Sequence, residues 1–132
     1  MTDRPAETYG DPLTQPFWQA ARERRLLIQR CGDCGRHQFY PRPYCIRCGG
    51  TVEWVESRGV GTVYSQTEVH VEVPGFTPPY VVGVVELDEG PRLTTHLVGA
   101  RVSIGERVSL DWRERADGFP PMYVFGPADS RG

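Results

Sequence analysis

The chain has 132 residues, of which 39% are hydrophobic, and it carries a formal net charge of −2. This length allows one ordinary domain or two very small ones, and the apolar content supports a modest core. No stretch is apolar for long enough to cross a bilayer as a helix, so no membrane partner is expected. The fifteen glycines and twelve prolines indicate many turns and short strands rather than a helical bundle.

The basic residues are unusual in type and in distribution. All fifteen are arginines, so the chain cannot form a lysine Schiff base, and that route to carbonyl chemistry is excluded. Between residues 22 and 47 only Glu23 and Asp33 are acidic, and the remainder of the chain is correspondingly acidic. Such a basic half can contact phosphates or an acidic partner, or it can be a solvated face. Its arginines are Arg22, Arg24, Arg25, Arg30, Arg36, Arg42 and Arg47.

The first predicted element is a short helix behind a polar, proline-containing lead over residues 1–13. Thr14 can cap this helix, Pro16 fits its first turn, and the helical pattern fades near Arg25. Trp18 on this helix needs an apolar surface. It either packs on the ribbon or barrel of this chain, or it anchors a partner subunit.

The four cysteines form two Cys-x-x-Cys pairs, CGDCG at 31–35 and CIRCGG at 45–50. Two such pairs can complete the tetrahedral thiolate set that zinc prefers. A glycine follows the second cysteine of each pair and permits a left-handed turn that aims backbone N–H groups at the sulfurs. The predicted metal ligands are Cys31, Cys34, Cys45 and Cys48.

Four cysteines at this spacing also have uses other than zinc binding. A disulfide framework is disfavoured because the N-terminus does not resemble an export signal, which also makes a cytoplasmic location the default. A thioredoxin-like motif needs one pair within a βαβ pattern, which the sequence lacks. Iron fits the same four sulfurs, as in rubredoxin-like centres, and would make the chain a one-electron carrier. Because thiolates fill all four positions, the metal is expected to hold the fold rather than to do chemistry.

Beyond Gly50 the sequence pattern is that of β-strands. A short strand over 26–28 precedes the cysteines, and we expect further strands over 52–57, 62–69, 80–87, 92–98, 107–112 and 122–125. Short strands with glycine-marked bends fit a small closed antiparallel barrel of the OB type. The predicted fold is therefore mainly β. It comprises a flexible lead (1–13), an N-terminal helix and rubredoxin-like zinc ribbon (14–50), a five-stranded OB-fold barrel (51–127) and a tail (128–132).

Four segments, taken in order, resemble a family of zinc-ribbon plus OB-fold proteins that accompany thiolase-like enzymes on acyl-CoA substrates. They are QPFWQAARERRLLIQRC, CGDCGRHQFYPRPYCIRCG, EWVESRGVGTVYSQTEVH and YVVGVVELDEGPRLTTHLVG. The resemblance runs from roughly Gln15 to Pro127. One departure is Ile46, where proline commonly follows the first cysteine of that pair, and it leaves the ligands unaffected.

The resemblance implies a non-catalytic accessory subunit of a thiolase or an aldolase, including aldolases that shorten steroid side chains held as CoA thioesters. It implies a hetero-oligomer with a thiolase-fold subunit, which itself holds most of the acyl-CoA. Some family members are fused to a hot-dog hydratase domain, so the chain is expected to be a free-standing subunit or a piece of such a fusion. No residue of this chain can be assigned to CoA from the resemblance.

The residues themselves agree with an accessory role. His37, His70 and His96 form no recognisable catalytic constellation, and no residue is predicted to be catalytic. Arginines near the ribbon could pair with CoA phosphates. The alternative function is single-stranded nucleic-acid binding, since ribbons and OB barrels both serve that purpose. Because the acidic barrel segment would repel phosphates, we expect no nucleic-acid partner.

Overall fold

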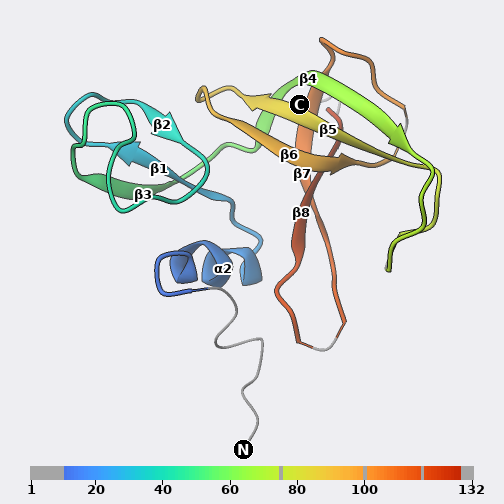
Figure 1. Cartoon of the computed structure of the whole chain (residues 1–132), viewed down its shortest axis with the longest axis horizontal. Coiled ribbons are helices and arrows are strands. Elements are labelled where there is room, and N and C mark those ends of the chain that lie inside the picture. The colour runs from blue at the N-terminus through green and yellow to red at the C-terminus, as the bar shows by residue number, and fades with distance from the viewer. Residues whose placement is uncertain (1–10, 75, 100, 117, 129–132) are drawn as a thin grey trace, which may run out of the picture.

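The computed structural model describes residues 11–74, 76–99, 101–116 and 118–128. Most of the expected lead and tail, residues 1–10 and 129–132, lies outside this range. Within it, no helix is long and apolar enough to cross a membrane. The elements in chain order are α2 (Gln15–Arg22), β1 (Leu27–Cys31), β2 (His37–Gln38), β3 (Val52–Glu56), β4 (Val60–Val69), β5 (Tyr80–Leu87), β6 (Arg92–Leu97), β7 (Arg107–Arg113) and β8 (Met122–Pro127) (Figure 1).

Helix α2 begins where the sequence predicts, but Thr14 does not cap it with its side chain. The Thr14 hydroxyl instead donates to the Asp11 carbonyl oxygen at 3.2 Å and accepts from the Asp11 N–H at 3.1 Å. This local turn therefore occupies the hydroxyl that would otherwise satisfy a helix N–H. Pro16 lies in the first turn, as expected, and the helix ends at Arg22, before the expected Arg25.

Strand β1 is the central strand of a small antiparallel sheet with the order β2-β1-β3. Gln29 of β1 pairs with Gln38 of β2, and Leu27–Cys31 pairs along its whole length with β3. Residues 52–56 lie inside the range 51–127 that the sequence assigned to the barrel, yet they hydrogen-bond to the ribbon. A buried central strand needs a neighbour on each side to satisfy its backbone, and β3 supplies the second one.

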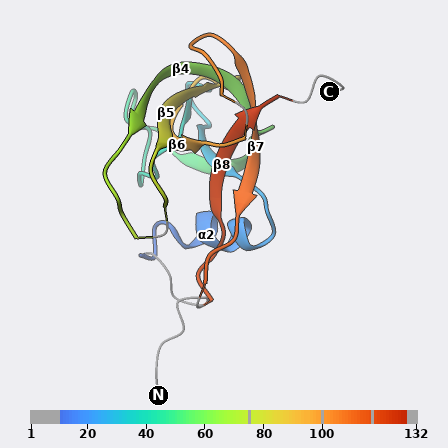
Figure 2. The ribbon, with the colours of Figure 1, turned by 90° about the vertical axis from the view of Figure 1, so that its right-hand side faces the viewer.

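The remaining strands close into a barrel with the order β4-β5-β6-β8-β7, which confirms the expected five-stranded OB-type barrel. Figure 2 shows these strands as a ring. The barrel is not wholly antiparallel as expected, because β6 and β8 pair in parallel at Leu97 and Phe125. An odd number of strands in a ring cannot alternate direction throughout. One parallel pair is therefore unavoidable, and it falls where the last strand meets β6.

One apolar cluster joins the helix, the ribbon and the barrel. The Phe17 ring of α2 lies edge-on to Phe39 of the ribbon, with centroids 5.8 Å apart, and to Tyr123 of β8, at 6.2 Å. Trp18 is half-buried and packs on Phe17 at 4.8 Å, so it contacts this chain's own core. The buried members of the cluster are Phe17, Leu26, Ile28, Phe39, Val63, Val85, Leu87, Leu93, Val102, Val108 and Phe125.

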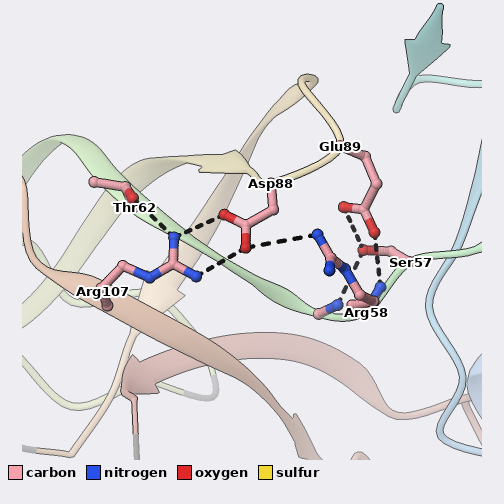
Figure 3. Close-up of polar contacts among 7 residues, drawn as sticks. Ser57, Arg58, Thr62, Asp88, Glu89 and Arg107 are labelled. Atoms are coloured by element: carbon pink, nitrogen blue, oxygen red, sulfur yellow. Dashed lines mark hydrogen bonds and ion pairs between the residues drawn. The ribbon is translucent and has the colours of Figure 1, made fainter.

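A polar cluster fixes the linker between ribbon and barrel (Figure 3). Glu89, in the β5–β6 turn, accepts hydrogen bonds from the Ser57 hydroxyl at 3.1 Å and from the Arg58 N–H at 2.8 Å. Beside it, Asp88 accepts two hydrogen bonds from the Arg107 guanidinium, at 2.7 and 2.8 Å. These hydrogen bonds from Arg107 hold the pKa of Asp88 below its usual value. The β5–β6 turn is thus tied both to the linker and to β7.

Candidate metal centre

The structure brings the four predicted ligands together. Their sulfur atoms all lie within 4.8 Å of one another. The Cys31 and Cys48 sulfurs are 3.5 Å apart, and those of Cys34 and Cys45 are 3.7 Å apart. Each close pair joins one cysteine from each Cys-x-x-Cys step, so the two steps face each other across one small volume. Cys31 and Cys45 are buried, whereas Cys34 and Cys48 are exposed.

Both Cys-x-x-Cys steps fold into the same turn. Gly35 has a φ of 77° and Gly49 a φ of 79°, which is the left-handed region that favours glycine. The Gly35 N–H donates to the Cys31 carbonyl oxygen at 3.0 Å, and the Gly49 N–H donates to the Cys45 carbonyl oxygen at 2.9 Å. The expected role of these two glycines is confirmed, because each closes the turn that places its cysteine pair.

Backbone N–H groups point at the first sulfur of each step. The Asp33 and Cys34 N–H groups donate to the Cys31 sulfur at 3.3 and 3.4 Å, and the Arg47 N–H donates to the Cys45 sulfur at 3.4 Å. Such donors favour thiolate over thiol. The Cys34 N–H accordingly holds the pKa of Cys31 below its usual value.

The pKa values of Cys45 and Cys48 are shifted in opposite directions, which bears on whether all four sulfurs can be thiolates. The Cys48 N–H, followed by that of Arg47, lowers the pKa of Cys45 to about 6. The Gly50 N–H also lowers the pKa of Cys48, but the neighbouring sulfurs, Cys31 first, and burial outweigh it and raise that pKa to about 12. Adjacent negative charges repel, so the four sulfurs can all be thiolates only around a cation. The donor set therefore fits a thiophilic metal ion.

Two buried glutamines support this centre, and sequence reasoning missed both. Gln29 is 2% exposed and Gln38 is 9% exposed. The Gln29 side chain accepts from the Arg42 N–H at 2.9 Å and donates to the Arg42 carbonyl oxygen at 3.0 Å. Gln38 accepts from the Ile46 N–H at 3.2 Å and donates to the Tyr44 carbonyl oxygen at 3.3 Å. The loop that carries the second cysteine pair is thus fastened to β1 and β2 by side chains.

The three histidines lie on separate parts of the fold. His37 is half-buried on β2, and His70 is exposed in the loop after β4. His96 lies on β6 and its ring stacks on the ring of Phe76, with centroids 4.0 Å apart. Within the described residues, the group that could hold a metal contains the four cysteines and none of these histidines.

A ribbon with four clustered cysteines followed by a closed five-stranded barrel places the chain among ribbon-plus-barrel proteins. Two family models match the chain in that order. Residues 18–54 match the ChsH2 rubredoxin-like zinc ribbon domain, and residues 54–113 match the ChsH2 C-terminal OB-fold domain. A solved structure named Ltp2-ChsH2(DUF35) aldolase contains a chain that is 42% identical, with a TM-score of 0.82 over 92% of this chain and 98% of that one.

Curated relatives agree with this assignment. A DUF35 domain-containing scaffold protein of Methanocaldococcus jannaschii is 34% identical over 88% of this chain and 89% of its own. A probable enoyl-CoA hydratase alpha subunit of Thermomonospora curvata is 47% identical over 85% of this chain. The 3-oxo-4,17-pregnadiene-20-carboxyl-CoA hydratase alpha subunit of Mycobacterium tuberculosis is 39% identical over 84% of this chain.

The chain belongs to the ChsH2 (DUF35) family of zinc-ribbon and OB-fold proteins. It spans only 37% and 36% of the length of the two hydratase alpha subunits, but 89% of the archaeal scaffold protein.

Proposed function

We propose that the chain is a non-catalytic accessory subunit of a thiolase-fold enzyme, a thiolase or an aldolase, that acts on acyl-CoA thioesters. The observation that carries this proposal is the near full-length similarity to the chain of the Ltp2-ChsH2(DUF35) aldolase. The residues support it, because the chain has no lysine and its four thiols share one cluster. The catalytic groups would come from the partner subunit, which would also hold most of the acyl-CoA.

Zinc is the metal that we propose for Cys31, Cys34, Cys45 and Cys48. A zinc ion with four thiolate ligands keeps no position open for water, so it would stabilise the ribbon without activating a substrate. Binding of this kind contributes roughly 10–16 kcal/mol of apparent folding free energy at neutral pH. The backbone N–H groups at the Cys31 and Cys45 sulfurs would disperse the charge of such a centre. Iron is the alternative, which metal analysis and the colour of the purified protein distinguish.

Steroid side-chain degradation is the setting that we propose for the complex. The support is the name of the M. tuberculosis relative, which specifies a pregnadiene-carboxyl-CoA thioester. A cytoplasmic location agrees with this setting, since metal-bound thiols persist where cysteines are kept reduced.

The test is reconstitution with the thiolase-fold subunit encoded in the same genome. The two chains should co-elute as a hetero-oligomer when co-expressed. The complex should turn over a steroid side-chain CoA thioester, whereas this chain alone should not. Failure of the two chains to associate, or turnover by this chain alone, would contradict the proposal. A straight-chain acyl-CoA, measured in parallel, separates the steroid setting from the accessory role.

A further inference from the structure

Two adjoining cavities separate the ribbon from the β5–β6 hairpin, which points toward the ribbon in Figure 1. Their volumes are about 460 and 250 Å³, and both are lined by His37, Gln38 and Ile46. Glu89 and Gly90 of the hairpin line the larger cavity, and Arg92 lines the smaller one. We call this surface the ribbon–hairpin cleft.

The arginines of this cleft differ from six other arginines of the described residues, which pair with carboxylates. Arg36 and Arg47 line the larger cavity, and Arg42 and Arg92 line the smaller one; all four are exposed. None of the four forms an ion pair with a carboxylate of the described residues. Elsewhere ion pairs join Arg24 to Glu114, Arg25 to Glu23 and Glu56, Arg30 to Glu53, Arg58 and Arg107 to Asp88, and Arg101 to Glu68.

The single carboxylate of the cleft is already engaged by the fold. Glu89 accepts hydrogen bonds from Ser57 and from the Arg58 N–H, as Figure 3 shows. It holds the linker in place, and its one negative charge offsets only part of the positive charge of the four arginines. Four arginines and one acidic residue thus line the two cavities taken together.

Exposed apolar side chains accompany this charge. Tyr40 is 52% exposed and lines the smaller cavity, and Ile46 is 63% exposed and lines both. Tyr64 is 49% exposed, and the Arg92 guanidinium lies 3.8 Å from its ring centroid. Arginine and tyrosine are the residue types that are enriched at the energetic centres of protein–protein interfaces.

We propose that the ribbon–hairpin cleft is a docking surface for an acidic face of the thiolase-fold partner subunit. The inference rests on the proposed function and adds the contact surface and its chemistry. Each unpaired guanidinium can take a carboxylate in a bidentate fork, and the tyrosines and Ile46 supply the apolar contact. Opposite charges on the two faces would speed encounter and fix the register of the two subunits.

A protein partner fits this surface better than a single-stranded nucleic acid. Nucleic-acid grooves combine a continuous positive track with aromatic rings on which successive bases stack. Here Glu89 places a negative charge in the larger cavity, beside Arg36 and Arg47. A phosphate backbone would approach that carboxylate, whereas discrete carboxylates of a protein face can avoid it.

The experiment measures binding of the metal-loaded chain to the thiolase-fold subunit by stopped-flow association and by titration at several salt concentrations. Arg36→Glu and Arg92→Glu, one from each cavity, should each slow association by about tenfold and weaken the salt dependence. Ile46→Ala should instead speed dissociation with little change in association. Arg101→Glu is the control, because Arg101 is also exposed but pairs with Glu68, at the end of β4 that lies away from the linker and ribbon. Metal content and melting temperature verify that each variant is folded.

Every outcome bears on the inference. Slower association in Arg36→Glu and Arg92→Glu, with Arg101→Glu unchanged, supports it. If the wild-type chain binds the thiolase-fold subunit and both charge reversals change the association rate by less than twofold, the docking surface is assigned wrongly, but the proposed function stands. A wild-type chain that does not bind the thiolase-fold subunit overturns the proposed function and this inference together. Salt-sensitive binding of a single-stranded oligonucleotide that the same two reversals abolish would assign the cleft to nucleic acid and overturn the inference as well.

Discussion

The amide nitrogen of Gln38 donates a hydrogen bond to the amide oxygen of Gln29 across 2.7 Å inside the ribbon sheet. The two residues are directly paired on β1 and β2, and both are buried. Because each glutamine also bonds the backbone of the 42–46 loop, the pair fixes the position of that loop and hence of the second cysteine pair. A buried polar network of this kind is stabilising only while every member is satisfied.

The first prediction concerns this network. Gln29→Leu keeps the side-chain volume but leaves the Arg42 N–H and carbonyl oxygen and one Gln38 donor without their partner. Each buried polar group left unpaired costs about 1–3 kcal/mol, so we expect a loss on the order of 3 kcal/mol in urea unfolding of the metal-loaded protein. Metal release to a chelator should also become faster. Gln19→Leu, at an exposed helix position, is the control and should change stability by less than about 0.5 kcal/mol.

The second prediction concerns the metal ligands. Cys34→Ser should abolish stoichiometric metal binding, since a serine hydroxyl does not ionise at neutral pH. Cys34→His is the control, because a Cys₃His set still holds zinc and position 34 is exposed. Metal per chain by mass spectrometry and amide exchange by NMR are the measurements. We expect exchange to rise in β1–β3 while β4–β8 stay protected, and a fully metallated Cys34→Ser protein would refute the ligand assignment.

The third prediction concerns the ion pair between Asp88 and Arg107. Asp88→Asn should lower the free energy of unfolding at pH 7 by about 1 kcal/mol, the upper end for exposed pairs with good geometry. Arg107 lowers the pKa of Asp88, so the contribution is present above the ordinary value of 3.8 and is lost as pH falls through the lowered pKa. The wild type and Asp88→Asn should therefore converge in stability on acidification below that value.

The fourth prediction concerns His96. Burial, and secondarily the charge of Arg113, lowers the pKa of His96, so the unfolded chain binds this proton at a higher pH than the folded chain does. Stability contributed by neutral His96 is complete above the ordinary value of 6.5 and declines as pH falls below it. Melting temperatures between pH 8 and pH 5 should show a smaller decline in His96→Gln than in the wild type.

Local patterns in the sequence were sufficient for the ligand cluster and for most strands. The spacing within each Cys-x-x-Cys step and the glycine after it fix a turn over a few residues. The convergence of the four cysteine side chains could therefore be predicted. Pairing over long separations could not be predicted in the same way. Nothing in Val52–Glu56 distinguishes a partner in β1 from one in the barrel, because alternation is the same in both. The parallel contact between Leu97 and Phe125 likewise follows from closure of the whole ring.

The side chains that support the site were harder to predict than its ligands. Gln29 follows Ile28 and Gln38 precedes Phe39 in the sequence. The apolar neighbour of each glutamine is the one sequence signal that the glutamine lies in a buried part of the strand. A glutamine between apolar strand residues reads equally well as the solvent face of an alternating strand. Which reading holds depends on the 42–46 loop, whose path is set by the second cysteine pair. The hydroxyl of Thr14 was misassigned for a related reason, since Asp11 offered it nearer partners than the helix did.

The contact of Phe17 with Tyr123 has a consequence for how the protein is made. Helix α2 is among the first described elements to leave the ribosome, and β8 is the last. The part of the Phe17 ring that contacts Tyr123 therefore stays uncovered until residues 122–127 have been synthesised, whereas Phe39 of the ribbon can pack on this ring earlier. Until then, β7 also has only β4 beside it, and the barrel is open. A ribosome stalled before β8 would thus leave apolar helix surface and the unpaired edges of β6 and β7 accessible to chaperones, whereas all strands of the ribbon would already be synthesised.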